Sequence, residues 1–170
     1  RLYRDNLEKS IPVKVDQILA QYDAGEQKSA FQLAKESSEK LKNSFSLNWL
    51  MILSASTVEQ KRKLLIKPGQ WKIYDKVVAD LVLSRLIKLK ELKLAEAAFT
   101  NYAKQKPKDQ YRQWRLALFY SKSGQCEKSN QITEKSLEIE SGKYKAGILD
   151  IKAFCQMQKK DLKGALNTYK

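Results

Sequence analysis

Apolar residues recur at every third or fourth position through the second half of the chain, beginning at Val77. This spacing is the period of an amphipathic α-helix. Short polar or glycine-containing segments separate the apolar runs, which read VVADLVLSRLIKL, LKLAEAAFTNYAKQ, WRLALFY, the segment after Gly124, AGILDIKAFCQM and DLKGALNTY. The pattern predicts a helix, a short turn and a second helix, repeated along the chain.

The predicted helix pairs repeat with an offset of 34 residues, which aligns Ala95 with Ser129. A fixed period of this size is typical of helical repeat proteins. In residues 110–143 the apolar, small and turn positions all fall at regular spacing: Leu116, Ala117, Tyr120, Gly124, Ser129 and Ser136. Residues 76–109 follow the same pattern, with Lys90 in place of the turn glycine, through Val82, Leu86, Ala95, Phe99, Tyr102 and Pro107.

This pattern resembles the tetratricopeptide repeat, a 34-residue helical hairpin. The resemblance implies an all-α fold, a right-handed α–α superhelix in which stacked hairpins form one continuous solenoid. Within residues 71–170 it covers three units: 76–109, 110–143 and a truncated 144–170, with about two residues inserted near Ser141 and Gly142.

The resemblance is best over residues 76–170. Residues 1–66 are interpreted as degenerate N-terminal repeats, and the resemblance there is a degenerate one over 11–66. There Gly25 and Ala30 have the glycine-to-small-residue spacing of the later units. The clearest break in the chain is KPGQ at 67–70. Trp71 is expected to open the helix that follows this break, and Trp49 is expected to lie in a core.

The residue inventory argues against an enzyme. The 170-residue chain contains no histidine, which removes Ser-His-Asp and Cys-His catalysis and histidine metal ligands. Its two cysteines do not complete a four-thiolate zinc site. Neither GxGxxG nor a GxxxxGK[ST] phosphate loop is present. We therefore expect no catalytic activity, no cofactor and no metal site.

The net charge of +14 comes mainly from lysine, and the lysines are spread along the chain. Arginine, the residue best suited to bidentate phosphate contacts, occupies only positions 1, 4, 62, 85, 112 and 115. A solvated basic surface is thus favoured over a nucleic-acid-binding one. The longest apolar run, LNWLMIL from Leu47, is too short for a membrane span. Because the chain starts without Met and stops inside a predicted helix, we expect it to be a piece of a larger protein.

In tetratricopeptide solenoids the first helices of successive repeats line a concave groove that binds a partner segment. Carried over to this sequence, the groove positions are Ser84, Lys88, Tyr111, Trp114, Arg115, Leu118, Lys122, Asp150, Phe154 and Met157. Aromatic and arginine side chains are common energetic hot spots of protein interfaces. A basic rim favours an acidic partner. The alternative is that Trp114 packs against the preceding hairpin.

The resemblance implies a non-catalytic protein-interaction scaffold, or a regulatory or assembly module, that binds a protein or peptide in this groove. Two contexts fit: a bacterial signalling protein of response-regulator type, and an envelope protein that assists pilus or secretion assembly. A basic helical repeat that binds nucleic acid is the alternative from another class. A truncated final hairpin would also permit self-association.

The two cysteines bear on the compartment. Cys126 begins the second helix of one unit, and Cys155 lies late in the first helix of the next. In stacked hairpins these positions lie at the same end, so a disulfide between adjacent repeats is one interpretation. Two separately buried thiols, usual in a reducing cytosol, are the other. A cytoplasmic location is favoured, and a bonded pair would indicate the bacterial periplasm instead.

Overall fold

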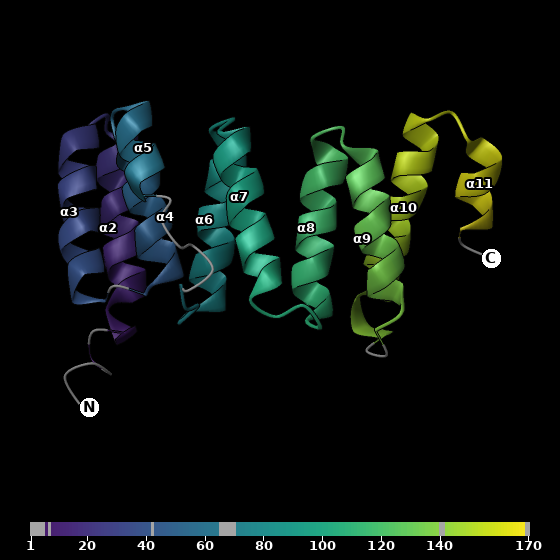
Figure 1. Ribbon diagram of the computed structural model, residues 1–170, viewed down its shortest axis with the longest axis horizontal. Helices are drawn as coiled ribbons and strands as arrows, with labels where there is room; N and C mark the ends of the chain where they lie inside the picture. Colours follow the sequence, from purple (N-terminus) through teal and green to yellow (C-terminus); the bar gives the residue numbers. More distant parts are fainter. Residues whose placement is uncertain (1–5, 7, 42, 65–70, 140–141, 169–170) are drawn as a thin grey trace. The chain divides into compact units, whose positions relative to one another are not determined.

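A computed structural model of the chain describes residues 6, 8–41, 43–64, 71–139 and 142–168 (Figure 1). The described residues form helices and no named strand, so the predicted all-α fold is confirmed. The helices are α2 (Ile11–Asp23), α3 (Gln27–Lys40), α4 (Phe45–Ser54), α5 (Val58–Leu64), α6 (Lys76–Lys88), α7 (Leu92–Lys104), α8 (Gln110–Lys122), α9 (Cys126–Leu137), the short 3-10 helix η2 (Gly142–Tyr144), α10 (Lys145–Gln158) and α11 (Leu162–Asn167).

The chain divides into two compact units, residues 1–94 and 95–170, and the division falls inside α7. The boundary expected at 66–71 and the single continuous solenoid remain predictions, and the KPGQ segment lies outside the described residues. In the part of the chain that the structure describes, no helix is both long and apolar enough to cross a membrane.

Helix α4 is the centre of the first unit, because all ten of its residues are buried. It contacts α2, α3, α5 and α6. Its sequence FSLNWLMILS is apolar around most of its circumference, as expected for a helix with neighbours on every side. Trp49 is fully buried, as predicted, and meets the ring of Trp71 edge to face with centroids 5.4 Å apart.

Trp71 does not open a helix, so that prediction is wrong. The chain beyond it is extended, and the Phe45 N–H donates to the Lys72 carbonyl at 2.8 Å. Helix α6 begins only at Lys76, where the Asp75 side chain accepts a first-turn backbone N–H at 3.1 Å. An aspartate at the N-cap fixes the start of a helix more strongly than apolar spacing does.

In the second unit each helix packs on its neighbours along the chain. Helix α8 contacts α9 and α10, α9 contacts α10, and α10 contacts α11 (Figure 1). Phe99 of α7 stacks on Phe119 of α8, with centroids 5.0 Å apart and 15° between the planes. The fully buried Ser129 hydroxyl donates to the Ala117 carbonyl at 2.9 Å. The small positions of the repeat are therefore places where α8 and α9 approach closely.

Four turns between consecutive helices share one backbone structure. Each has a residue with positive φ: Gly25 (81°), Lys90 (57°), Gly124 (76°) and Lys160 (62°). The N–H of that residue donates to the carbonyl three positions earlier, at 2.9–3.2 Å. The next N–H donates to the carbonyl five positions earlier, at 2.8–3.2 Å. These two bonds define the Schellman motif, so Lys90 adopts the conformation that the repeat normally assigns to glycine.

Candidate functional site

An open groove of about 400 Å³ lies between α8 and α10. We call it the α8–α10 groove. Six of the groove positions expected from the sequence line it: Trp114, Leu118, Lys122, Asp150, Phe154 and Met157. Ser121, Gly147 and Ile151 complete the lining. Most of this surface is apolar, which is the composition of a site that binds apolar side chains.

One wall follows from the four-residue spacing of Trp114, Leu118 and Lys122 on α8. Residues four apart lie on the same face of a helix. The opposite face carries Leu116 and Tyr120, which are buried in the second unit. Burial of one face of α8 in the core thus turns the other face toward the groove.

The other wall is the exposed side of α10. Phe154 and Met157 are 38 % and 51 % exposed, whereas Ile148 and Ile151 are buried. Single exposed apolar side chains are common, but Phe154 and Met157 line one groove with Trp114 and Leu118, and a contiguous apolar surface is typical of an interaction site. The wall therefore presents uncovered apolar surface beside a buried aliphatic floor.

The position of Trp114 depends on a glycine in the facing helix. A Cβ added to Gly147 would lie 2.9 Å from Trp114 Nε1. The indole also stacks on Tyr144, with centroids 6.0 Å apart and 18° between the planes. Sequence reasoning missed both partners. A glycine inside the apolar pattern of AGILDIKAFCQM was the available signal for a close approach.

Two other expected groove residues do not line the groove. Tyr111 packs against Trp114 and Tyr144, with centroids 5.6 and 5.2 Å away. The guanidinium carbon of Arg115 lies 5.7 Å from the centroid of the Phe99 ring. Tyr111 therefore packs on the two rings at the Trp114 side of the groove, and Arg115 packs against α7. Ser84 and Lys88 lie on α6, in the first unit.

The structure joins Cys126 and Cys155 in a disulfide, with Cα atoms 5.3 Å apart. The bond connects the first residue of α9 to α10, and Cys155 directly follows Phe154 of the groove wall. Cys155 is fully buried and Cys126 is 7 % exposed. Whether the protein carries this bond in its host remains a prediction.

A polar cluster connects α7, α8 and α9 away from the groove lining. Lys128 donates to Glu96 at 2.7 Å, and the Tyr120 hydroxyl donates to the same oxygen at 3.3 Å. The hydrogen bond from Lys128 is the main cause that lowers the pKa of the Glu96 carboxyl. Partial desolvation raises this pKa, whereas the positive charge of Lys128 and the hydrogen bond from Tyr120 lower it further. The same hydrogen bond raises the pKa of Lys128. This cluster is a structural connection between helices.

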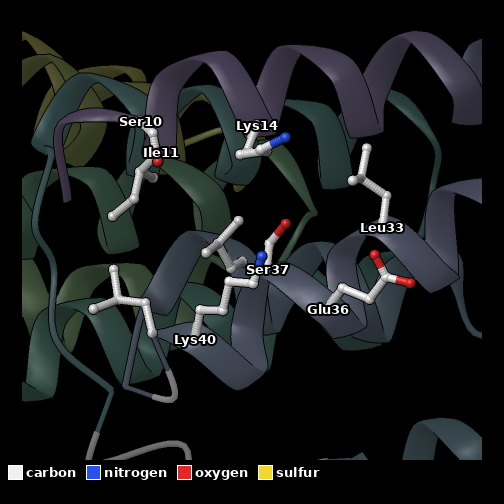
Figure 2. A pocket seen from close by; sticks show the side chains of 9 residues that line it. Ser10, Ile11, Lys14, Leu33, Glu36, Ser37 and Lys40 are labelled. Carbon is white, nitrogen blue, oxygen red and sulfur yellow. The ribbon is translucent and has the colours of Figure 1, made fainter. Parts of the chain in front are cut away.

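A smaller pocket lies in the first unit between α2 and α3 (Figure 2). Its volume is about 110 Å³, well below the several hundred Å³ of a usual small-molecule site. Its lining mixes aliphatic and charged side chains, including Ile11, Leu33, Lys14 and Glu36. Among the described residues, no three His, Cys, Asp or Glu side chains are grouped so that they could hold a metal ion. The α8–α10 groove is thus the stronger candidate for a site.

No protein-family model and no curated protein sequence matches this chain. Among solved structures, it is similar to MamA residues 41 to the end from Desulfovibrio magneticus RS-1. The two sequences are 17 % identical, and the match has a TM-score of 0.47 and covers 93 % of this chain and 90 % of that chain. It is also similar to two further MamA crystal structures, each with 13 % identity. The first match has a TM-score of 0.48 and covers 88 % of this chain and 88 % of the MamA chain. The second has a TM-score of 0.49 and covers 93 % of this chain and 87 % of the MamA chain. These scores are too low to support an argument about function.

Proposed function

We propose that the protein is a non-catalytic interaction module of tetratricopeptide type, and that it binds a segment of a partner protein in the α8–α10 groove. The observation that supports this most directly is the lining of that groove. Trp114, Leu118, Phe154 and Met157 come together from two consecutive first helices. Aromatic residues and methionine are enriched at protein interfaces relative to the rest of the surface.

The charge of the second unit supports an acidic partner. Residues 95–170 contain fifteen Lys and Arg against eight Asp and Glu. Lys122 lies at the groove itself, while Asp150 on the facing wall is the single acidic residue of the lining. A partner segment with large apolar side chains and acidic flanks would be attracted by the unit and anchored in the groove.

The disulfide favours an envelope protein over a cytoplasmic signalling protein. Disulfides persist in oxidising compartments such as the bacterial periplasm and are rare in the cytosol. A bond between Cys126 and Cys155 supports the envelope context, an assembly or scaffold role there. The signalling context would require both cysteines to remain thiols.

The nucleic-acid alternative gains no support from the described arginine side chains. Arg85 pairs with Asp23, and Arg112 donates to the Tyr102 carbonyl at 3.2 Å. Arg115 lies against the Phe99 ring. All three are thus used inside their own unit. Filter binding at two salt concentrations tests the alternative, because phosphate contacts make affinity fall steeply with salt.

The test of the proposed function uses a random peptide library displayed on phage and selected against the oxidised protein. Selected peptides are then titrated against three proteins: the wild type, the Trp114→Ala, Phe154→Ala variant and a Leu162→Ala, Leu166→Ala control. Leu162 and Leu166 are 70 % and 63 % exposed on α11 and lie outside the groove lining.

We expect the groove variant to bind at least about tenfold more weakly, because truncating an interface hot spot costs about 2 kcal/mol or more. The control variant should bind as the wild type does. Circular dichroism is recorded to check that the three proteins have the same helicity. Equal affinity of the groove variant and the wild type would contradict the proposal.

A further inference from the structure

The two ends of the α8–α10 groove are stabilised by different interactions. At one end, which we call the aromatic end, the Trp114 indole lies against Gly147 and stacks on Tyr144. Tyr111 packs behind both rings. These contacts join α8 to the start of α10 through packing, and the Tyr144 N–H also donates to Gln110 Oε1 of α8 at 3.2 Å. The relative position of the walls at this end therefore does not require a covalent bond.

At the other end, which we call the cysteine end, the structure provides a covalent connection. Cys155 directly follows Phe154 on the α10 wall, and Cys126 lies four residues after Lys122 of the α8 wall. Their Cα atoms are 5.3 Å apart. The bond thus joins the two walls within a few residues of the lining on each side.

At the cysteine end the Thr168 hydroxyl donates to Gln156 at 2.6 Å, which connects α10 to the end of α11. Non-covalent support from the α8 and α9 side is weak. Phe154 and Met157 are partly exposed, so their side chains have few neighbours. An ion pair between Lys159 and Glu127 spans 3.8 Å, with side chains 53 % and 86 % exposed. Exposed ion pairs of this kind contribute little to stability. Without the disulfide, the end of α10 would be held mainly by the buried residues nearer its middle.

We propose that the Cys126–Cys155 disulfide determines whether the α8–α10 groove can bind, so that only the oxidised protein has a competent site. This inference rests on the proposed function, and it concerns regulation of the same groove. In the oxidised protein the α10 wall is held at both the aromatic end and the cysteine end of the groove. In the reduced protein α10 loosens at the cysteine end, and the groove is correctly shaped in only a fraction of molecules. Apparent affinity falls in proportion to that fraction.

The chemistry is an exchange of two electrons and two protons. A protein or small-molecule disulfide oxidises the two thiols; the new sulfur–sulfur bond forms as the oxidant's disulfide becomes a dithiol. A dithiol reductant reverses the exchange. A thiolate must reach one of the sulfur atoms for either reaction. Because Cys155 is fully buried and Cys126 nearly so, this exchange requires local opening of the structure. Reduction and reoxidation of the folded protein are therefore slower than those of an exposed disulfide.

The first part of the experiment measures backbone protection without any partner. Hydrogen exchange is followed by mass spectrometry in the oxidised protein and after reduction with dithiothreitol. We expect exchange in residues 152–160 to accelerate about tenfold or more on reduction, because local opening becomes easier. Residues 110–118, at the aromatic end, should accelerate less than residues 152–160, and by no more than the loss of global stability on reduction requires. The Cys126→Ala, Cys155→Ala variant is the control, and it should match the reduced protein with or without the dithiol.

The second part measures binding with the phage-selected peptides as the probe. We expect affinity for the reduced protein, and for the double alanine variant, to be about tenfold lower than for the oxidised protein. That ratio corresponds to a competent fraction of about one in ten. Circular dichroism is recorded on every sample.

Each outcome decides the proposal. Local loosening together with weaker binding supports it. Equal protection and equal binding in the two redox states overturn it. Loss of all helical signal on reduction also overturns it, because the bond would then maintain the whole unit and not the groove. If the peptides bind the Trp114→Ala, Phe154→Ala variant as tightly as the wild type, the proposed function fails, and hydrogen exchange alone still decides whether the bond fixes the cysteine end.

Discussion

The indole of Trp114 lies directly over the backbone of Gly147, at a distance that leaves no room for a side chain there. Alanine at position 147 would place its Cβ 2.9 Å from Trp114 Nε1. Glycine in the middle of a helix costs roughly 0.5–1 kcal/mol relative to alanine, and less in a first turn, where Gly147 of α10 lies. Glycine at position 147 thus lowers the stability of α10 slightly and leaves space for the Trp114 ring.

This relationship predicts the result of a double-mutant cycle. In a Trp114→Ala background, Gly147→Ala should raise the free energy of unfolding, because only helix propensity changes, but by less than the roughly 1 kcal/mol of a helix interior, because residue 147 lies in the first turn of α10. With Trp114 present, the same substitution should give no increase, because the ring must move. Urea denaturation of the four proteins measures the difference, and near-UV circular dichroism reports the displaced indole. Equal effects in both backgrounds would show that the contact is absent.

The positive-φ lysines predict stabilising substitutions. A residue with a side chain pays about 1–2 kcal/mol in the left-handed region, and glycine does not. Part of this is offset by the greater freedom that glycine gives the unfolded chain. We expect Lys90→Gly and Lys160→Gly each to raise the free energy of unfolding by about 0.5–1 kcal/mol.

Two controls bracket that prediction. Lys88→Gly, two residues earlier at the last residue of α6, should lower the free energy of unfolding, because glycine is a poorer helix former than lysine and a helical φ gains nothing from glycine's left-handed freedom. Gly124→Ala should also be destabilising, because φ is 76° there although no atom lies within 4 Å of the added Cβ. A Lys90→Gly protein no more stable than the wild type would argue against the left-handed turn.

The disulfide predicts the number of free thiols and a loss of stability on reduction. In protein isolated without reductant and then denatured, we expect no reactive thiol. The bonded cysteines are 29 residues apart, and closing a loop of that size in the unfolded chain is worth about 3–4 kcal/mol. The reduced protein should be less stable by roughly that amount in urea. Two reactive thiols in the untreated protein would exclude the bond.

The ion pair of Glu96 and Lys128 predicts how stability depends on pH. Because the pKa of Glu96 is lowered in the folded protein, its contribution is present above the ordinary glutamate pKa and is lost as the pH falls through the lowered value. Because the pKa of Lys128 is raised, its contribution is present below the ordinary lysine pKa and is lost as the pH rises through the raised value.

Thermal melts at a series of pH values compare the wild type with Glu96→Gln. The wild type should lose more of its thermal stability than the variant does when the pH falls below about 4, near and below the ordinary glutamate pKa. Between pH 6 and 9 the difference between the two proteins should stay constant. A difference that varies across the neutral range would require another titrating group.

Repeat spacing was sufficient to predict much of the groove. Trp114, Leu118 and Lys122 are four residues apart, so they share a helix face wherever the helix lies. Gly147 and Tyr144 were missed because their role depends on how closely two helices approach, which a helix period does not encode. Arg115 was expected in the groove, but its guanidinium lies against Phe99 of another helix.

The first unit was harder to predict for a different reason. Helix α4 is buried on all sides, so its sequence has no polar face from which a direction could be inferred. The extended chain at Trp71 depends on a backbone hydrogen bond between Phe45 and Lys72, which are far apart in sequence. Local patterns carry no information about such a pairing.

The positions of the shared left-handed turns also give the repeat period along the chain. Successive left-handed residues lie 34 positions apart from Lys90 to Gly124 and 36 apart from Gly124 to Lys160. From Gly25 to Lys90 the interval is 65, close to two repeats, and the α4–α5 connection that lies between them has no left-handed residue. The left-handed turns thus recur with the repeat period even where lysine stands in place of glycine. A segment excised between two such residues, such as 91–124, begins and ends in matching geometry, which makes it a natural cassette for lengthening or shortening the protein.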